Sequence, residues 1–202
     1  MKVITLISSN PGAGKTFISI NLAMSLALTN KKVVLVDLDI RKGTLSSHAS
    51  TAAGMGVTHY LSGKTDRVED VITKGELSAN LDIIHMGPLP PNPAELLLSE
   101  RLDTLIAGLK EHYDYIILDN VPAGMVADAS IVDRVVDLTI YVIRAGKMDR
   151  RQLPEIEKMY RQSKFNNMSI VLNGVDYKSG GYGYGYGYGY GYGYGYGNEK
   201  KK

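Results

Sequence analysis

The stretch SSNPGAGKT, residues 8–16, has the residue types and spacing of a loop that binds the phosphates of a nucleotide. Against the pattern G-x-x-x-x-G-K-[ST], Gly14, Lys15 and Thr16 match, whereas Ser9 replaces the leading glycine. In such a loop backbone N–H groups surround phosphate oxygens, the lysine brings its charge to the β- and γ-phosphates, and the hydroxyl binds Mg²⁺. A glycine turn with an incidental lysine is the alternative, but an apolar run precedes this stretch and a helical pattern follows it. The stretch therefore predicts a site for a nucleoside triphosphate.

Two further segments place carboxylates after apolar runs. VVLVDLDIRKG, residues 33–43, carries Asp37 and, two residues later, Asp39, and YIILDNVP, residues 115–122, carries Asp119. Carboxylates beside a phosphate loop can hold Mg²⁺ or its waters, and can accept a proton from an attacking hydroxyl. An aspartate at the end of a strand is otherwise a helix cap or a solvent contact. For Asp119 we favour the metal role, whereas for Asp39 the cap remains an equally good interpretation.

The chain closes with SGGYGYGYGYGYGYGYGYGNEKKK, residues 179–202, in which tyrosine and glycine alternate. Glycine makes the backbone permissive and costly to order, so we expect this tail to be disordered. By composition alone a low-complexity linker is the simpler interpretation. A domain that binds a nucleoside triphosphate could, however, phosphorylate the phenolic hydroxyls. The candidate acceptors are Tyr182, Tyr184, Tyr186, Tyr188, Tyr190, Tyr192, Tyr194 and Tyr196.

Alternating apolar and amphipathic segments must position these groups. Nearly continuous apolar runs predict strands that are covered on both faces, and they lie at residues 3–8, 33–38, 81–86, 115–119, 138–144 and 169–173. Helical patterns lie between them, beginning with residues 15–30. Alternating strands and helices predict an α/β fold with a doubly wound, mostly parallel sheet, the architecture of P-loop NTPases. Ligands in that architecture bind at the carboxyl ends of the strands, where the loop and the aspartates lie.

A second helix is predicted within PPNPAELLLSERLDTLIAGLKEHY, residues 90–113. Asn92 is a candidate N-cap, Pro93 suits the first helical position, and Glu95 stands three residues after the cap. These signals predict one helix that begins after Asn92 and continues to the end of the segment.

Size and composition bound the remaining possibilities. The chain has 202 residues, which suits one domain with a sizeable core over residues 1–178 and the tail over residues 179–202. The net charge of +2 and the scattered basic residues give no reason to expect a nucleic-acid partner. The absence of cysteine excludes disulfides and fits a reducing compartment. Without a signal peptide or an apolar run of about 20 residues, the sequence predicts a cytoplasmic domain.

Taken together, these motifs resemble those of the bacterial tyrosine kinases of the P-loop type, the BY-kinase family. NPGAGKT resembles the family's Walker A motif, VVLVDLDIRKG its extra Walker A′ motif, and IILDNVP its Walker B motif. PPNPAELLLSERL at residues 90–102 also resembles a family segment, and a tyrosine-rich C-terminus is a family trait. One departure is the sequence DNVP, where the family commonly has Asp-x-Pro-Pro, which affects the turn more than the carboxylate.

The resemblance implies roles for individual residues. Lys15 and Thr16 would hold phosphate and metal, Asp37 would accept the proton of the acceptor hydroxyl, and Asp39 and Asp119 would support the metal. The implied catalytic residues are Lys15, Asp37, Asp39 and Asp119, and the implied Mg²⁺ ligands are Thr16, Asp37 and Asp119. ATP would contact Pro11, Gly12, Ala13, Gly14, Lys15, Thr16, Phe17 and Asn173, with Asn173 either at the adenine or in a simple turn.

The resemblance also implies partners. It implies Mg-ATP as cofactor, autophosphorylation of the tail between copies, ring-shaped homo-oligomers, and control of exopolysaccharide or capsule synthesis and export. A transmembrane activator domain or subunit and a cognate tyrosine phosphatase would accompany the domain at the inner face of the membrane. Because the chain begins directly before its first predicted strand, we expect a catalytic domain of a longer protein, with weakened ring assembly.

Two other functions remain open at this point. A partition or positioning ATPase of the same superfamily would use ATP as a switch, but such proteins usually have a second lysine early in the loop, where this chain has Asn10. A nucleotide-sensing scaffold without catalysis, carrying a low-complexity tail, is the other.

Overall fold

A computed structural model describes residues 1–40, 54–120 and 126–176. In this part of the chain the strands form one sheet in the order β3-β4-β2-β5-β1-β6-β7. The strands are β1 Val3–Ile7, β2 Val33–Asp37, β3 Thr73–Ser78, β4 Leu81–Ile84, β5 Tyr115–Asp119, β6 Leu138–Arg144 and β7 Ser169–Asn173. All neighbouring strands run parallel except β3, which is antiparallel to β4. The predicted α/β fold with a mostly parallel sheet is confirmed.

Two features of the sheet differ from the sequence prediction. β3 was not predicted, because its residues TKGELS are mostly polar and almost all exposed, so they show no apolar pattern. The runs predicted at 3–8, 33–38 and 81–86 end one or two residues earlier, since the chain there leaves the sheet for the loops at its carboxyl edge. The other three strands have the predicted bounds.

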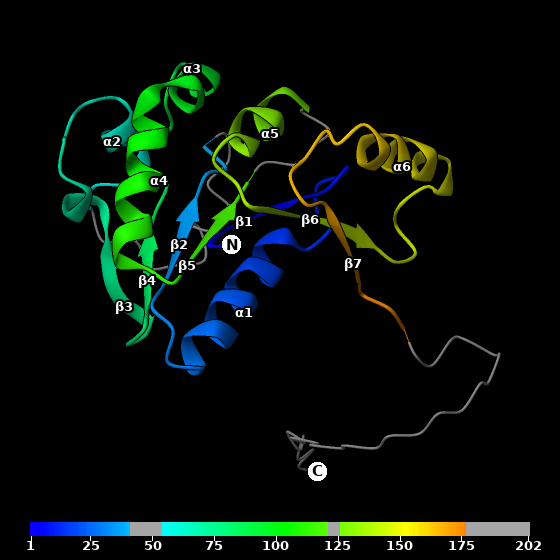
Figure 1. Cartoon of the computed structure of the whole chain (residues 1–202), viewed down its shortest axis with the longest axis horizontal. Helices are drawn as coiled ribbons and strands as arrows, with labels where there is room; N and C mark the ends of the chain where they lie inside the picture. Colours follow the sequence, from blue (N-terminus) through cyan, green and yellow to red (C-terminus); the bar gives the residue numbers. More distant parts are fainter. Residues whose placement is uncertain (41–53, 121–125, 177–202) are drawn as a thin grey trace, which may run out of the picture.

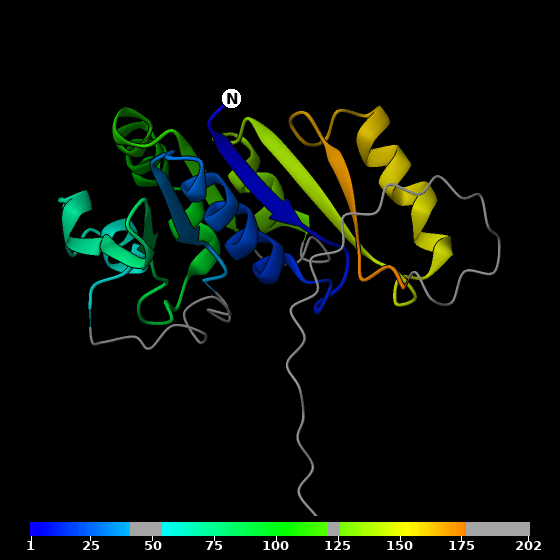
Figure 2. The same ribbon diagram turned by 90° about the horizontal axis from the view of Figure 1, so that it is seen from below.

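Helices cover both faces of the sheet (Figure 1). They are α1 Lys15–Leu28, α2 Val57–Leu61, α3 Pro93–Leu98, α4 Glu100–His112, α5 Val126–Asp133 and α6 Leu153–Arg161, with 3₁₀ turns η1 Val68–Val71 and η2 Arg150–Gln152. Figure 2 shows α1 in front of the sheet, while α4, α5 and α6 lie behind it. This is the doubly wound arrangement that crossover connections between parallel strands produce.

The core divides between the two faces. On one face Ala23 and Ala27 of α1 pack on Leu6 and Leu35 of the central strands. On the other face the core forms two neighbouring clusters, one packed against α4 and one against α6. Val3 belongs to the first and Ile7 to the second, although both side chains lie on the same face of β1. The central strands are therefore buried on both sides, as their continuous apolar runs predicted. The same prediction was wrong for β7, which is mostly exposed because it lies at the edge of the sheet.

The segment 90–113, in which one helix was predicted to begin after Asn92, forms the two helices α3 and α4, so the prediction of one helix was wrong. Ser99 between them is extended, and its hydroxyl donates to the Leu96 carbonyl oxygen at 2.7 Å. The guanidinium of Arg134 donates to the carbonyl oxygens of Leu97 at 2.8 Å and Ser99 at 3.2 Å. These bonds satisfy the carbonyl groups that a helix end exposes, so the break is stable.

The start of this segment also differs in detail from the prediction. Pro93 is the first residue of α3, as expected, but the side chain of Asn92 makes no capping bond to the backbone. Its amide instead donates to the Glu95 carboxylate at 2.6 Å. The two side chains bond to each other, so the reciprocal bonds between side chain and backbone that define a capping box do not form.

No helix in the described ranges combines the length and the apolar character that crossing a lipid bilayer requires.

Candidate active site

The phosphate loop connects β1 to α1 at the carboxyl edge of the sheet. Gly12 and Gly14 have φ of 75° and 95°, in the left-handed region that favours glycine. A Cβ atom on Gly14 would lie 2.3 Å from the side-chain nitrogen of Asn173. That amide donates to the Ala13 carbonyl oxygen at 2.8 Å, which ties the loop to the end of β7. The loop therefore keeps the shape that lets its N–H groups turn inward.

Lys15 begins α1 and is buried in the site. Its Nζ donates to the Ser8 hydroxyl at 3.4 Å. Burial lowers the pKa of Lys15, and the nearby carboxylates of Asp119 and Asp39 partly oppose that shift. A lysine held this way gains much from an anionic phosphate, because a new negative charge would compensate its desolvation.

Asp119 is at the end of β5 and is almost fully buried. One carboxylate oxygen accepts from the Thr16 hydroxyl at 2.7 Å, and the other accepts from the Ser19 hydroxyl at 3.1 Å. Burial raises the pKa of Asp119 and Asp39 adds to this, while both hydroxyls and Lys15 lower it. Through the bond to Thr16, the Walker B carboxylate contacts the hydroxyl of the phosphate loop. The sequence motifs predict that these two groups bind the same metal ion.

Asp37 ends β2 directly beside Asp119, since the two residues are paired in the parallel register of β2 and β5. Its side chain is fully buried. One of its carboxylate oxygens accepts from the backbone N–H of Asp39 at 3.1 Å, which fixes the turn that leaves the strand. Asp39 is also buried, and its charge acts on Lys15. The residues that follow Ile40 lie outside the described part of the chain, so the cap interpretation of Asp39 and its role at a metal both stay predictions.

The donor set fits a magnesium ion. Carboxylate and hydroxyl oxygens, which Mg²⁺ prefers, meet at Thr16 and Asp119, with Asp37 next in register. In the described ranges no group of three or more His, Cys, Asp and Glu side chains converges on one point. An ion here would thus take its remaining ligands from water and phosphate oxygens, as Mg²⁺ commonly does at nucleotide sites.

The residues predicted to contact the nucleotide differ in how exposed they are to solvent. Ala13 and Lys15 are buried, whereas Pro11 and Gly12 are exposed. Phe17, the third residue of α1, is 66% exposed. Asn173 does lie at the loop, so it is more than a turn residue, although its role at adenine stays a prediction.

Two groups of predicted residues cannot be compared with the structure. The eight tail tyrosines and the domain boundary at residue 178 lie outside the described residues. The same holds for Pro122 in the departure from the Walker B pattern.

Three polar residues at the site were missed by the sequence analysis. Ser8 meets the Lys15 ammonium, and Ser19 is the second hydroxyl on Asp119. The guanidinium of Arg144 lies beside Gly14, because a Cβ there would be 3.8 Å from its Nη1. Ser19 could have been found by helical spacing, three residues after Thr16 on the same face. Arg144 ends β6, so the strand-end rule used for aspartates would have found it.

Sequence relatives of the chain are known. A family model described as an AAA domain matches residues 1–140. The tyrosine-protein kinase CpsD of Streptococcus pneumoniae serotype 4 is 34% identical over 186 residues, which cover 90% of this chain and 80% of that protein. A Klebsiella pneumoniae protein described as a putative tyrosine-protein kinase in the cps region is 36% identical over 177 residues. That match covers 88% of this chain and 24% of the relative.

Solved structures share the fold. The kinase domain of the Escherichia coli tyrosine kinase ETK superposes with a TM-score of 0.80 at 32% identity, covering 93% of this chain and 73% of that one. The septum site-determining protein MinD from Pyrococcus horikoshii, solved with Mg-ADP, has a TM-score of 0.67 at 22% identity, covering 85% and 69%. The second likeness shows the fold alone.

Proposed function

Because the chain belongs to the family of bacterial tyrosine-protein kinases, we propose that it transfers the γ-phosphoryl group of Mg-ATP to the tyrosines of its C-terminal tail, from one copy to another. The observation that carries the site assignment is the contact between the Thr16 hydroxyl and Asp119 at 2.7 Å, with Asp37 next in register. This contact brings the Walker A and Walker B segments together, and the Walker A′ carboxylate lies beside them.

The proposed roles follow from position and charge. The loop from Pro11 to Thr16 binds the phosphates, and Lys15 neutralises charge on the group being transferred. Thr16, Asp37 and Asp119 hold the Mg²⁺ ion, which when bound draws charge from the β- and γ-phosphate oxygens. Asp39 holds the turn after β2 through its backbone N–H, and its carboxylate adds to the negative charge that balances Lys15.

In the transfer step the phenolic oxygen of a tail tyrosine forms a bond to the γ-phosphorus, and the bond from that phosphorus to the β,γ-bridging oxygen breaks. ADP leaves with the bond's electron pair, and the phenolic proton passes to the Asp37 carboxylate. A base is needed because the hydroxyl has a pKa of about 10 and is a poor nucleophile at neutral pH. Asp37 can serve because it ends β2 in register with Asp119, at the edge of the sheet where the phosphate loop lies.

The biological setting extends the proposal. We propose that the kinase regulates synthesis and export of a capsule or exopolysaccharide, and the relative described as lying in a cps region supports this. We propose that it acts at the inner face of the membrane, with a transmembrane activator domain or subunit and a tyrosine phosphatase that reverses the modification. The full-length protein would assemble as a ring, in which the tail of one copy reaches the site of the next.

Incubation with labelled Mg-ATP, followed by mass mapping of the tail, tests the kinase activity. We expect label on tail tyrosines and almost none in Lys15→Met, because the buried ammonium then no longer meets the phosphates. A tail with phenylalanine in place of tyrosine is the control for acceptor identity. Label that persists in Lys15→Met contradicts intrinsic activity. ATP turnover without label instead favours a positioning ATPase, although Asn10 stands where those proteins usually have lysine.

A further inference from the structure

One edge of the sheet is open on its apolar side. β7 is the last strand in the sheet order, and within the described ranges it pairs only with β6. Ile170 and Leu172 of β7 are each 57% exposed, whereas every residue of β1 and β2 is buried. An unpaired edge strand with large exposed apolar side chains is a favourable site for another strand to pair.

The register shows which face these side chains occupy. Ile170 is paired with Tyr141 of β6, and Leu172 with Ile143. Because paired residues of parallel strands point to the same face, both side chains lie on the α6 side of the sheet. There α6 covers Tyr141 of β6, which is fully buried, but leaves Ile170 and Leu172 on the neighbouring strand β7 exposed. These two side chains form an open row on the outer strand.

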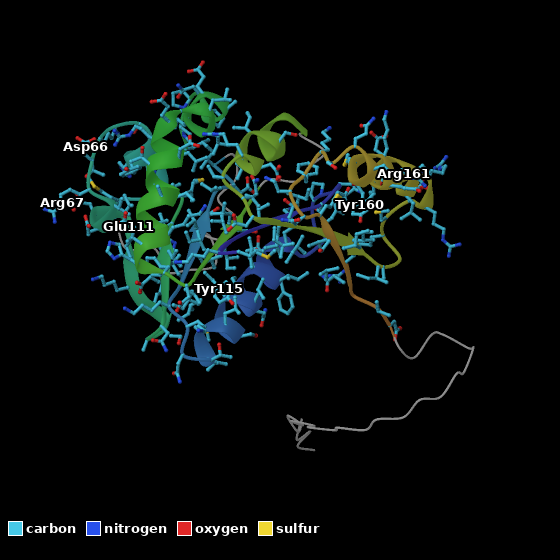
Figure 3. All side chains as sticks on the ribbon, viewed as in Figure 1. Asp66, Arg67, Glu111, Tyr115, Tyr160 and Arg161 are labelled. Atoms are coloured by element: carbon cyan, nitrogen blue, oxygen red, sulfur yellow. The ribbon has the colours of Figure 1, made fainter. Side chains whose placement is uncertain are left out.

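The open row forms one wall of a groove of about 580 Å³. Its other wall is α6, and its lining residues are Leu153, Pro154, Ile156, Glu157, Tyr160, Met168 and Ile170. Tyr160 is 65% exposed and projects from α6 near β7 (Figure 3). The charged member, Glu157, is already paired with Arg161 at 2.6 Å. The groove therefore offers apolar and aromatic contacts with one satisfied charge at its rim.

The backbone of β7 also suits an added strand. The Asn173 carbonyl oxygen accepts from the Ala145 N–H at 2.9 Å, on the β6 side. Since backbone groups of successive strand residues point to alternate sides, those of Ile170 and Leu172 point to the open edge. A peptide that pairs with this edge can thus combine backbone bonds with side-chain contacts in the groove.

We propose that the groove between α6 and β7 binds the tyrosine–glycine segment, residues 182–196, of a second copy of this chain. In an extended conformation the repeat puts every ring on one face and only glycine on the other. The rings would face α6, Ile170 and Leu172. The glycines would lie on the opposite face of the added strand. A section as long as β7, about 17 Å, would dock two or three rings.

A second copy fits the groove better than the chain's own tail because of direction. β7 runs toward the phosphate loop, where Asn173 contacts Ala13. The chain's own tail would have to reverse after Asp176 and run back along β7, away from the nucleotide site. A tail from another copy can run parallel to β7, so that its following tyrosines emerge beside the loop.

This inference rests on the proposed function for its purpose, since it makes the groove the docking site of the acceptor. Docked rings would hold the tail while other tyrosines react. A phosphorylated tyrosine brings charge that an apolar groove does not accommodate, so the product would leave.

Binding of a labelled peptide tests the docking directly. The probe is fluorescein-labelled GYGYGYGYGYGYGYGYG, the sequence of residues 181–197, and the protein is the full chain with its eight tail tyrosines replaced by serine. We expect Ile170→Thr and Tyr160→Gln each to weaken binding about tenfold in fluorescence anisotropy, because each removes apolar contact area. Both replacements keep the local strand or helix preference.

Leu28→Gln is the matched control, since Leu28 is a 75% exposed apolar residue at the far end of α1. It should leave binding unchanged. Equal affinities for the groove variants, the control and the parent would overturn the proposal.

A mixing assay identifies which copy supplies the groove. The donor is the chain with serine in the tail, and the acceptor is Lys15→Met with its own tail. We expect Ile170→Thr in the donor to raise the KM for the acceptor about tenfold with kcat unchanged. The same change in the acceptor should have no effect, and an effect confined to the acceptor would overturn the assignment to a second copy. If no mixture is labelled while peptide binding still depends on the groove, the proposed function fails and the docking site stands.

Discussion

The buried environment of Asp119 disfavours the ionised form of its carboxyl group. Burial raises its pKa, and the bonds from Thr16 and Ser19, with the charge of Lys15, only partly oppose this. The folded chain therefore binds this proton more tightly than the unfolded chain does. As pH rises from the carboxyl pKa of an unfolded chain, about 4, ionisation of Asp119 removes stability from the fold. A divalent cation bound to the ionised Asp119 would restore that stability.

We expect Asp119→Asn to raise the unfolding temperature of the nucleotide-free protein at neutral pH, because the uncharged amide escapes this cost. The difference should shrink as pH falls toward about 4, where the parent's Asp119 is protonated. Differential scanning calorimetry across this range measures it. With Mg-ATP the order should reverse, since only the parent gains from the metal. A parent that is the more stable at neutral pH without nucleotide would mean that the hydroxyl bonds outweigh burial.

At the scale of elements, the strand–loop–helix unit is what makes the site. Gly12 and Gly14 both have positive φ, but they differ in their surroundings. A Cβ on Gly12 would have no atom within 4 Å, whereas one on Gly14 would meet the Asn173 amide at 2.3 Å. The loop is therefore strained by any side chain at either position, and obstructed only at Gly14.

This contrast predicts unequal effects of alanine. Gly12→Ala should cost about 1–2 kcal/mol of unfolding free energy through backbone strain alone. Gly14→Ala should cost about 1 kcal/mol more, because the Asn173 amide must give up its bond to Ala13. Urea unfolding measures both, with Gly63→Ala as a control that has positive φ and open space far from the loop. Equal losses for Gly12→Ala and Gly14→Ala would show that the Asn173 contact does not matter.

At the scale of the whole molecule, phosphorylation would change the balance of charge. The chain has a net charge of +2, and the tail ends in three lysines. Each phosphotyrosine adds about −1.5 to −2, so eight would bring about −12 to −16. A tail with this charge would repel other modified tails and the carboxylates around Lys15.

We therefore expect phosphorylation to dissociate assemblies that docked tails hold together. Sedimentation velocity of intact protein after Mg-ATP treatment, compared with the same protein after a phosphatase, measures the change. Higher salt should weaken the difference, because it screens exposed charges. The same assembly state before and after dephosphorylation would refute this expectation.

Much of the site could be predicted from the sequence because its determinants are local. A glycine loop between an apolar run and a helix, and aspartates that end apolar runs, are enough to place Lys15, Thr16, Asp37 and Asp119 at one edge of a parallel sheet. The strands at 115–119, 138–144 and 169–173 were predicted with their observed bounds for the same reason. Each is a mostly apolar run bounded by polar residues, which indicates a strand. The run does not show whether both faces of the strand are covered, and most of β7 is exposed.

Other features depended on residues far apart in the sequence. The helix break at Ser99 is stabilised by Arg134, 35 residues later, and β3 is held by pairing with β4 although its residues are mostly polar. Only the fold decided that Asp37 and Asp119 are neighbours in register, and that the outer row of β7 stays uncovered by α6. Periodicity reports which face of an element is apolar. Sheet order, burial of charge and the open edge arise from long-range packing, which no local pattern encodes.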